Sequence, residues 1–200
     1  MTPTVPLPRT PLPLEDADGT ARWYEHELGW AVAGGRPVEL LTGLRFDVLE
    51  LPADAGFAVL RRCGAQLGPV ALLGQRMRLL VAAGSAEELP GLLDWLEWGG
   101  VALALRALGA GGRMTAPAPP GRAGPQGAAV WLRPPEPGHE VEPTLPAFAG
   151  LGCRGEAPDL VRLVGTAATE CHRARLLRAT VHYRGSSPGS AATSQPLAFS

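Results

Sequence analysis

The sequence predicts an α/β (α+β) domain, in which a mixed central sheet is flanked by helices and a further helix is added at the C-terminal end. First, helical and strand-like segments mix along the chain without the strict alternation of a Rossmann fold. Second, residues 69–73 and 77–82 are apolar runs, interrupted only by Arg78, as expected for strands covered on both faces. Third, residues 159–178 carry apolar side chains at helical spacing in one stripe.

Composition limits the classes of protein that fit. The chain has 200 residues, of which 46% are hydrophobic, enough for one packed domain. Its net charge of −1 lacks the basic excess of a dedicated double-stranded DNA binder. The three cysteines are widely spaced, which argues against a disulfide framework or a CxxC zinc pair. No signal-like start or bilayer-length apolar run is visible, so we expect a cytoplasmic protein with no membrane partner.

The first third of the chain begins with a Pro-punctuated extended arm over residues 1–14. A helix is predicted over residues 21–28, because Gly29 follows it as a typical helix terminator. Residues 30–33 and 37–41 then form two short strands with a Gly-Gly break between them.

The segment at residues 46–51 is predicted to be a buried strand that carries two acids, Asp47 and Glu50. A helix over residues 52–63 follows, with Pro52 in its first turn, where a missing N–H is tolerated. A buried carboxylate is unfavourable unless it is paired or holds a metal. This strand is therefore where we place the candidate site.

The middle of the chain contains a hairpin and a capped helix. Gly74-Gln75-Arg76 joins the two apolar strands, and Ser85 begins a capping box for a helix over residues 86–98. The remaining strands are predicted at residues 101–105, 113–116 and 128–133.

The last third begins with a Pro-rich, acidic strap over residues 134–146, which reads as a linker or a segment lying across the surface. The C-terminal helix of residues 159–178 follows, with arginines in its last turn, where the helix dipole favours positive charge. The Ser/Gly/Pro-rich tail of residues 181–200 is predicted to be disordered.

Several pieces, taken in order, resemble a known family. They are GWAVAG, LLTGLRFDVLELPADAG, LLGQRMRLLVAAGS, WGGVALALRALGAGGRMTAPAPPG and AAVWLRPP, and they span roughly residues 20–133. This set is similar to small actinobacterial proteins of the bifunctional DNA primase/polymerase amino-terminal (prim-pol) domain family, in the archaeo-eukaryotic primase superfamily. The resemblance implies a prim-pol-like domain at residues 15–133. The strap and C-terminal helix of residues 134–180 are then expected to pack on it.

The resemblance also implies where catalytic residues should stand. In the family, two acids separated by one residue end the strand that matches residues 46–51, and with a later acid they hold divalent metals. The matching positions here are Glu50, Pro52 and Ala104. Asp47 cannot replace the second acid, because residues three apart on a strand point to opposite faces. A lone carboxylate is a poor Mg²⁺ site, so Glu50 and Asp47 read as residual catalytic positions, with no metal site and no cofactor.

Four arginines are candidates for binding phosphate. The resemblance places Arg78 near a phosphate-binding histidine of the family, and Arg76, Arg106 and Arg113 line the same cleft if the strands stack as they do there. The alternative is that these arginines are scattered and solvated. For the two acids, the alternative is a strand-end carboxylate that is exposed or paired with an arginine such as Arg45.

The leading hypothesis is a catalytically inactive primase/polymerase-like domain that acts as a nucleic-acid, nucleotide or protein interaction module. A second hypothesis is an active primase/polymerase with rearranged ligands, which requires Mg²⁺ or Mn²⁺. A third is a structural or oligomerisation protein that uses its C-terminal helix or its Pro-rich strap as the partner surface.

Overall fold

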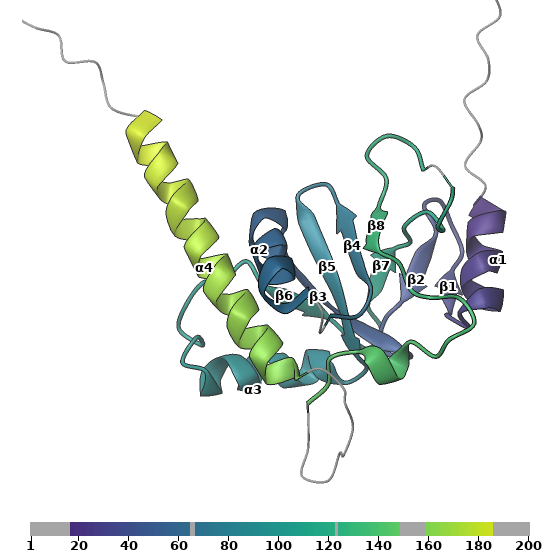
Figure 1. Ribbon diagram of the computed structural model, residues 1–200, viewed down its shortest axis with the longest axis horizontal. Helices are drawn as coiled ribbons and strands as arrows, with labels where there is room; N and C mark the ends of the chain where they lie inside the picture. Colours follow the sequence, from purple (N-terminus) through teal and green to yellow (C-terminus); the bar gives the residue numbers. More distant parts are fainter. Residues whose placement is uncertain (1–16, 65–66, 123, 149–158, 186–200) are drawn as a thin grey trace, which may run out of the picture.

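The computed structural model describes residues 17–64, 67–122, 124–148 and 159–185, and the predicted N-terminal arm lies outside them (Figure 1). The predicted α/β (α+β) class with a C-terminal helix is confirmed. The helices are α1 (Ala17–Glu27), α2 (Ala53–Cys63), α3 (Ser85–Trp95), the 3-10 turn η2 (Glu142–Thr144) and α4 (Leu160–Gly185). The strands are β1 (Val32–Ala33), β2 (Glu39–Leu41), β3 (Phe46–Pro52), β4 (Val70–Leu73), β5 (Arg76–Ala82), β6 (Arg106–Leu108), β7 (Arg113–Thr115) and β8 (Val130–Arg133).

These strands form two sheets, ordered β1-β2-β7 and β6-β3-β5-β4-β8. Every pairing between these strands is antiparallel, which differs from the single mixed sheet expected from the sequence. The reason is the β4–β5 hairpin, in which Leu73 pairs with Arg76 and Gly74 adopts a φ of 55°. This hairpin inserts β5 between β3 and β4, so two strands that run in the same direction never pair.

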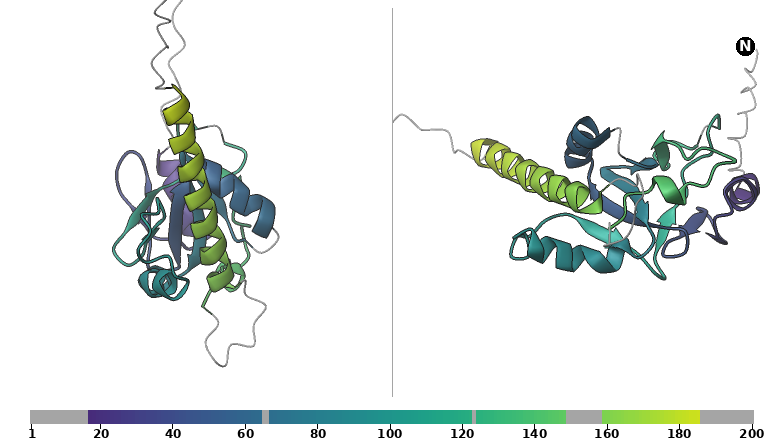
Figure 2. Two further views of the ribbon diagram at one scale, coloured as in Figure 1. Left: turned by 90° about the vertical axis from the view of Figure 1, so that its left-hand side faces the viewer. Right: turned by 60° about the horizontal axis from the view of Figure 1, so that its bottom comes forward.

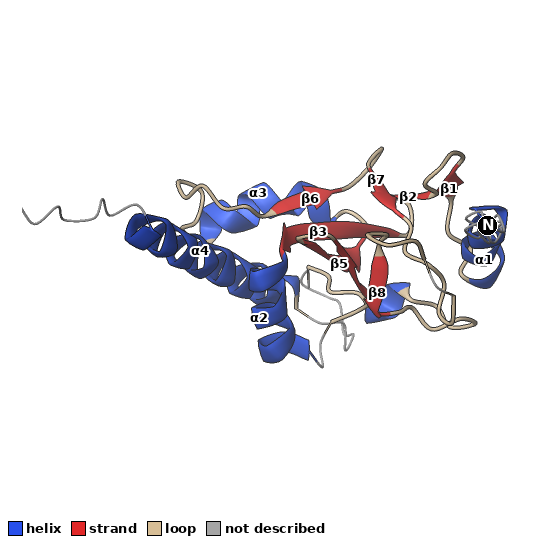
Figure 3. Ribbon diagram, turned by 90° about the horizontal axis from the view of Figure 1, so that it is seen from above, coloured by secondary structure: helices blue, strands red, loops and turns tan. Residues whose placement is uncertain are grey.

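Strand β3 is an interior strand of the larger sheet, between β6 and β5, and all seven of its residues are buried. Alternation along the strand sends its side chains into two cores. Leu49 and Leu51 pack with residues of α2, α3 and α4, whereas Phe46 and Val48 pack with Tyr24 of α1 and other residues on the opposite side. Figures 1 and 3 show α2, α3 and α4 on one side of β3 and β5, with α1 and the smaller sheet on the other.

The apolar stripe of helix α4 packs against the protein's own core. The stripe is buried from Leu160 to Ala174, whereas Leu177 is 63% exposed. Beyond the buried part, the helix projects past the rest of the described chain (Figure 2). It continues to Gly185, so the predicted boundary of the tail at residue 181 was too early.

The segment before β6 is not the strand that we predicted over residues 101–105. Helix α3 ends at Trp95, and Glu97 follows with a φ of 63°. The chain then runs as an irregular loop until Arg106. Its Ala102 and Ala104 carbonyls accept hydrogen bonds from arginine side chains rather than from a neighbouring strand. Side-chain partners from distant elements thus override the local apolar pattern.

The Pro-rich strap lies against the domain. Val141 and Leu145 are buried in the core on the α1 side, and the backbone N–H of Ala82 donates to the carbonyl of Pro146 at 2.9 Å. Among the described helices, none is long and apolar enough to span a membrane.

Candidate functional site

Glu50 is placed opposite two arginines by the register of the sheet. It pairs with Arg78 on β5 and with Arg106 on β6, and Arg76 lies opposite Pro52. Residues directly opposite each other on antiparallel strands share a face. All three arginines therefore emerge on the face that bears Glu50, which is turned away from α2, α3 and α4.

The three guanidinium groups converge on the Glu50 carboxylate. Nε of Arg76 and Nε of Arg106 donate to Oε1 at 3.0 Å and 2.9 Å. Nε of Arg78 donates to Oε2 at 2.9 Å. Arg76 also donates through Nη2 to the Ala104 carbonyl at 3.0 Å, which ties the group to the loop before β6. We call Glu50, Arg76, Arg78 and Arg106 the arginine cluster.

The charge of the arginine cluster is unbalanced, because one carboxylate stands among three guanidinium groups. Burial disfavours ionisation of Glu50 and is the largest single influence on its pKa. The hydrogen bonds from Arg78, Arg76 and Arg106 together outweigh it, so the pKa of Glu50 lies below its ordinary value. The carboxylate is thus charged at neutral pH, and an excess of positive charge remains around it.

Exposure rises outward from the carboxylate. The side chain of Glu50 is 1% exposed, that of Arg78 is 11% exposed and that of Arg106 is 65% exposed. The Nη1 atom of Arg78 is buried and has no hydrogen-bond partner among the described residues. Buried donors usually have a partner. The cluster therefore has a fixed anionic centre, a spare internal donor and a solvent-facing arginine.

Asp47 lies on the opposite face of β3 and takes no part in the arginine cluster. Its Oδ2 accepts a hydrogen bond from the backbone N–H of Ala86 at 2.8 Å, at the start of α3. This contact replaces the predicted Ser85 cap, since α3 has Gly84 at its N-cap position and no side-chain cap there. Burial raises the pKa of Asp47, against the effect of the Ala86 hydrogen bond. Its observed role is to anchor α3 to the sheet.

Arg113, the fourth arginine named from the sequence, is not part of the cluster. It lies on β7 in the smaller sheet, where its Nη1 is 3.6 Å from Oε2 of Glu39, and its side chain is 58% exposed. Arg45, the suggested partner of the two acids, instead binds Glu142 of the strap at 2.9 Å. Only three of the four predicted arginines therefore meet.

The residues around Glu50 do not fit a divalent metal ion. Both carboxylate oxygens already accept guanidinium N–H groups, and three positive charges at this distance repel a cation. Pro52 supplies no ligand on this face, and the Ala104 carbonyl is bound to Arg76. In the described part of the chain, no group of three His, Cys, Asp or Glu side chains is arranged to hold a metal.

Sequence reasoning named all four members of the arginine cluster, but it did not predict that the three arginines would pair with Glu50. The spacing of Arg76 and Arg78 shows that they share a face of β5, because side chains two apart on a strand point the same way. Nothing local showed that β3 and β6 would bring Glu50 and Arg106 to that face.

Comparisons with protein families, with curated proteins and with solved structures found no match to this chain. The resemblance to the prim-pol domain therefore stays a prediction, and the function has to be argued from the arginine cluster itself.

Proposed function

We propose that this protein is a non-catalytic module that binds the phosphate groups of nucleic acid or nucleotides through its arginine cluster. The observation that carries the proposal is the convergence of three guanidinium groups on one buried carboxylate. Arginine is suited to this task, because its planar fork of donors matches the oxygens of a phosphate.

The members of the arginine cluster differ in burial, and this difference supports phosphate binding. Glu50 holds the guanidinium groups in fixed positions, so little side-chain entropy is lost when a ligand arrives. Arg106 presents its donors to solvent, and Arg76 is the next most exposed member at 31%. A phosphate at this rim would contact Arg106 and Arg76 while Glu50 neutralises only part of their charge.

The same arrangement argues against the active primase/polymerase alternative. Two-metal catalysis needs carboxylates that converge on a pair of cations. Here Glu50 is surrounded by cations, and Asp47 points to the other face of the strand. The module therefore belongs to the binding class rather than to the nucleotidyltransferases.

The proposal includes a cytoplasmic setting. Cys63 and Cys171 are free and buried thiols, as expected in a compartment that keeps cysteines reduced.

Binding can be measured by the fluorescence anisotropy of a labelled single-stranded oligonucleotide. Phosphate contacts by the two rim arginines, Arg106 and Arg76, predict a slope of about −1.4 in a plot of log affinity against log salt concentration, since single strands give roughly −0.7 per contact. Arg106→Gln should weaken binding and make this slope shallower by about 0.7. Arg113→Gln is the matched control, because Arg113 has similar exposure but lies outside the cluster.

Competition and activity assays complete the test. Displacement of the oligonucleotide by deoxyadenosine triphosphate would identify a nucleotide site, and lack of displacement would identify a preference for the polymer. The proposal is refuted if the protein does not bind the oligonucleotide at low salt. It is also refuted if Arg113→Gln weakens binding as much as Arg106→Gln does. Primer extension in Mg²⁺ or Mn²⁺ would show that the enzyme alternative is correct.

A further inference from the structure

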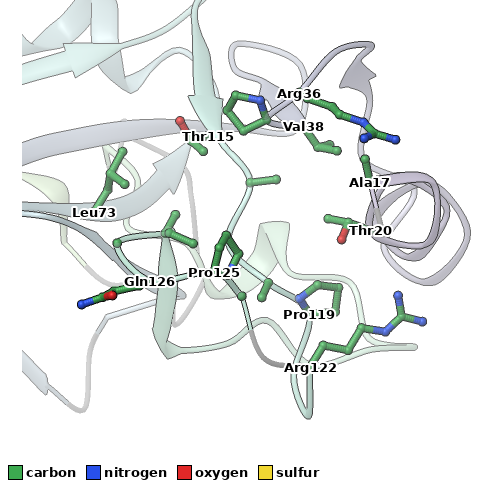
Figure 4. A pocket seen from close by; sticks show the side chains of 17 residues that line it. Ala17, Thr20, Arg36, Val38, Leu73, Thr115, Pro119, Arg122, Pro125 and Gln126 are labelled. Carbon is green, nitrogen blue, oxygen red and sulfur yellow. The ribbon is translucent and has the colours of Figure 1, made fainter. Parts of the chain in front are cut away.

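A cavity of about 520 Å³ lies between the start of α1, the end of β7 and the loop formed by residues 117–122 and 124–129. This volume is within the usual range of small-molecule sites, which is roughly 300–1,000 Å³. Figure 4 shows Leu73 and Gln126 toward one end of the cavity, and Arg36 and Arg122 at the other end, on either side of Thr20. The cavity is separate from the arginine cluster, none of whose residues lines it.

The walls of this cavity are held by hydrogen bonds. The backbone N–H of Ala118 donates to the Ala129 carbonyl at 3.3 Å and closes the base of the loop. The hydroxyl of the buried Tyr24 donates to the Pro117 carbonyl at 2.8 Å. These contacts tie the loop to α1 and to itself, so the cavity is formed before any ligand arrives.

The lining is mostly apolar, with Thr20, Thr115 and Gln126 as neutral polar side chains and two arginines at one end. Prolines, alanines, Val38 and Leu73 make most of the wall, and the described lining residues include two arginines and no acidic side chain. Arg36 is exposed and makes no hydrogen bond or ion pair with the rest of the described chain. Asp18, on the first turn of α1, lines a neighbouring cavity that Arg122 also borders. The uncompensated positive charge of the cavity is therefore at Arg36.

We propose that this cavity binds a small amphipathic anion, with an apolar body against Leu73 and the prolines and a carboxylate beside Arg36. Apolar walls with a few placed polar groups are typical of ligand sites, in which the polar groups fix orientation. The cavity offers a cation at one end only, so a monoanion with a single acidic end matches it.

The probe for the test is 1-anilinonaphthalene-8-sulfonate, an aromatic sulfonate whose fluorescence rises in apolar surroundings. Purified full-length protein should bind it saturably. Octanoate should then displace the probe at a concentration about tenfold lower than octanol does. The two compounds differ only in the head group, which is a charged carboxylate in octanoate and an uncharged hydroxyl in octanol. Absence of saturable probe binding, or equal displacement by the two competitors, would overturn the proposal.

Two variants locate the binding to this cavity. Ala128→Trp fills the lining and should abolish saturable binding of the probe, whereas Ala179→Trp on the exposed part of α4 should not. Arg36→Gln should lower the affinity for octanoate by about fivefold and leave the affinity for octanol unchanged, as expected for one partly screened charge pair. Arg61→Gln, another exposed arginine, is its control. Circular dichroism and thermal unfolding should be used to check that each variant is folded. Loss of octanoate binding in Arg61→Gln, or none in Arg36→Gln, contradicts the assignment.

Discussion

Glu50 and Arg78 face each other across β3 and β5, with Nε of Arg78 2.9 Å from Oε2 of Glu50, and both residues are at least nine-tenths buried. An ion pair this deep in a sheet is stabilising only while it stays complete. Removal of one member leaves the other charge buried without compensation. This dependence makes the arginine cluster testable by stability measurements that need no ligand.

Glu50→Gln should destabilise the protein by about 3–5 kcal/mol, because it leaves the buried guanidinium group of Arg78 without its anion. Urea unfolding followed by circular dichroism measures the change. A loss of under about 1 kcal/mol, the level of an exposed ion pair, would show that the cluster is solvated and not a buried network.

Asp47→Asn should change stability much less than Glu50→Gln, although both acids lie on the same strand. Burial raises the pKa of Asp47, so the fold disfavours its charged form. An amide oxygen can still accept from the Ala86 N–H. We expect Asp47→Asn to change the free energy of unfolding at neutral pH by less than about 1 kcal/mol, whereas Asp47→Ala should cost about 1–2 kcal/mol through loss of the helix cap. Equal effects of the two substitutions would contradict this role.

Arg78 and Arg106 should separate stability from binding. Arg78→Gln removes a buried, charge-assisted hydrogen bond and should cost about 1.5–3 kcal/mol. Arg106 is 65% exposed, so Arg106→Gln should cost no more than about 1 kcal/mol. Oligonucleotide affinity should instead fall in Arg106→Gln. If Arg106→Gln unfolds the protein as strongly as Arg78→Gln does, the proposed division between core and rim is wrong.

Acid should weaken the fold through Glu50. Its folded-state pKa is depressed, so the unfolded chain binds more protons in the acidic range and stability rises with pH there. The contribution is complete above the ordinary value of 4.5 and is lost as pH falls through the folded-state pKa. The urea concentration at the midpoint of unfolding should decrease as the pH is lowered below 4.5. In Glu50→Gln the urea midpoint should depend less on pH. An equally steep dependence in this variant would show that other groups cause the acid sensitivity.

Gly56 is expected to be irreplaceable in the packing of α2 on β5. A Cβ atom added there would lie 2.7 Å from Cβ of Met77, which is fully buried. Gly56→Ala should therefore destabilise the protein by about 1–3 kcal/mol through overpacking. Gly91→Ala in α3 is the matched control, since nothing lies within 4 Å of its added Cβ. That substitution should stabilise by about 0.5–1 kcal/mol. Thermal unfolding of the two variants should shift in opposite directions.

Local patterns were enough to predict most of the central elements. The strands β3 and β5 follow from apolar runs, and the hairpin before β5 follows from Gly74, because these signals act between neighbouring residues. The loop before β6 shows where such reasoning ends. Its apolar run resembles a strand, but the Ala102 and Ala104 carbonyls bind Arg175 and Arg76, which come from distant parts of the chain.

The sequence by itself determined that Asp47 and Glu50 point to opposite faces of one strand, because the two-residue period of a strand is a local property of the backbone. It also determined that Arg76 and Arg78 share a face. Only the tertiary structure decided that Glu50 meets three arginines while Arg113 pairs with Glu39 in another sheet. The reason is strand order: β5 and β6 flank β3 although 23 residues separate Ala82 from Arg106, and no short-range pattern encodes which strands become neighbours.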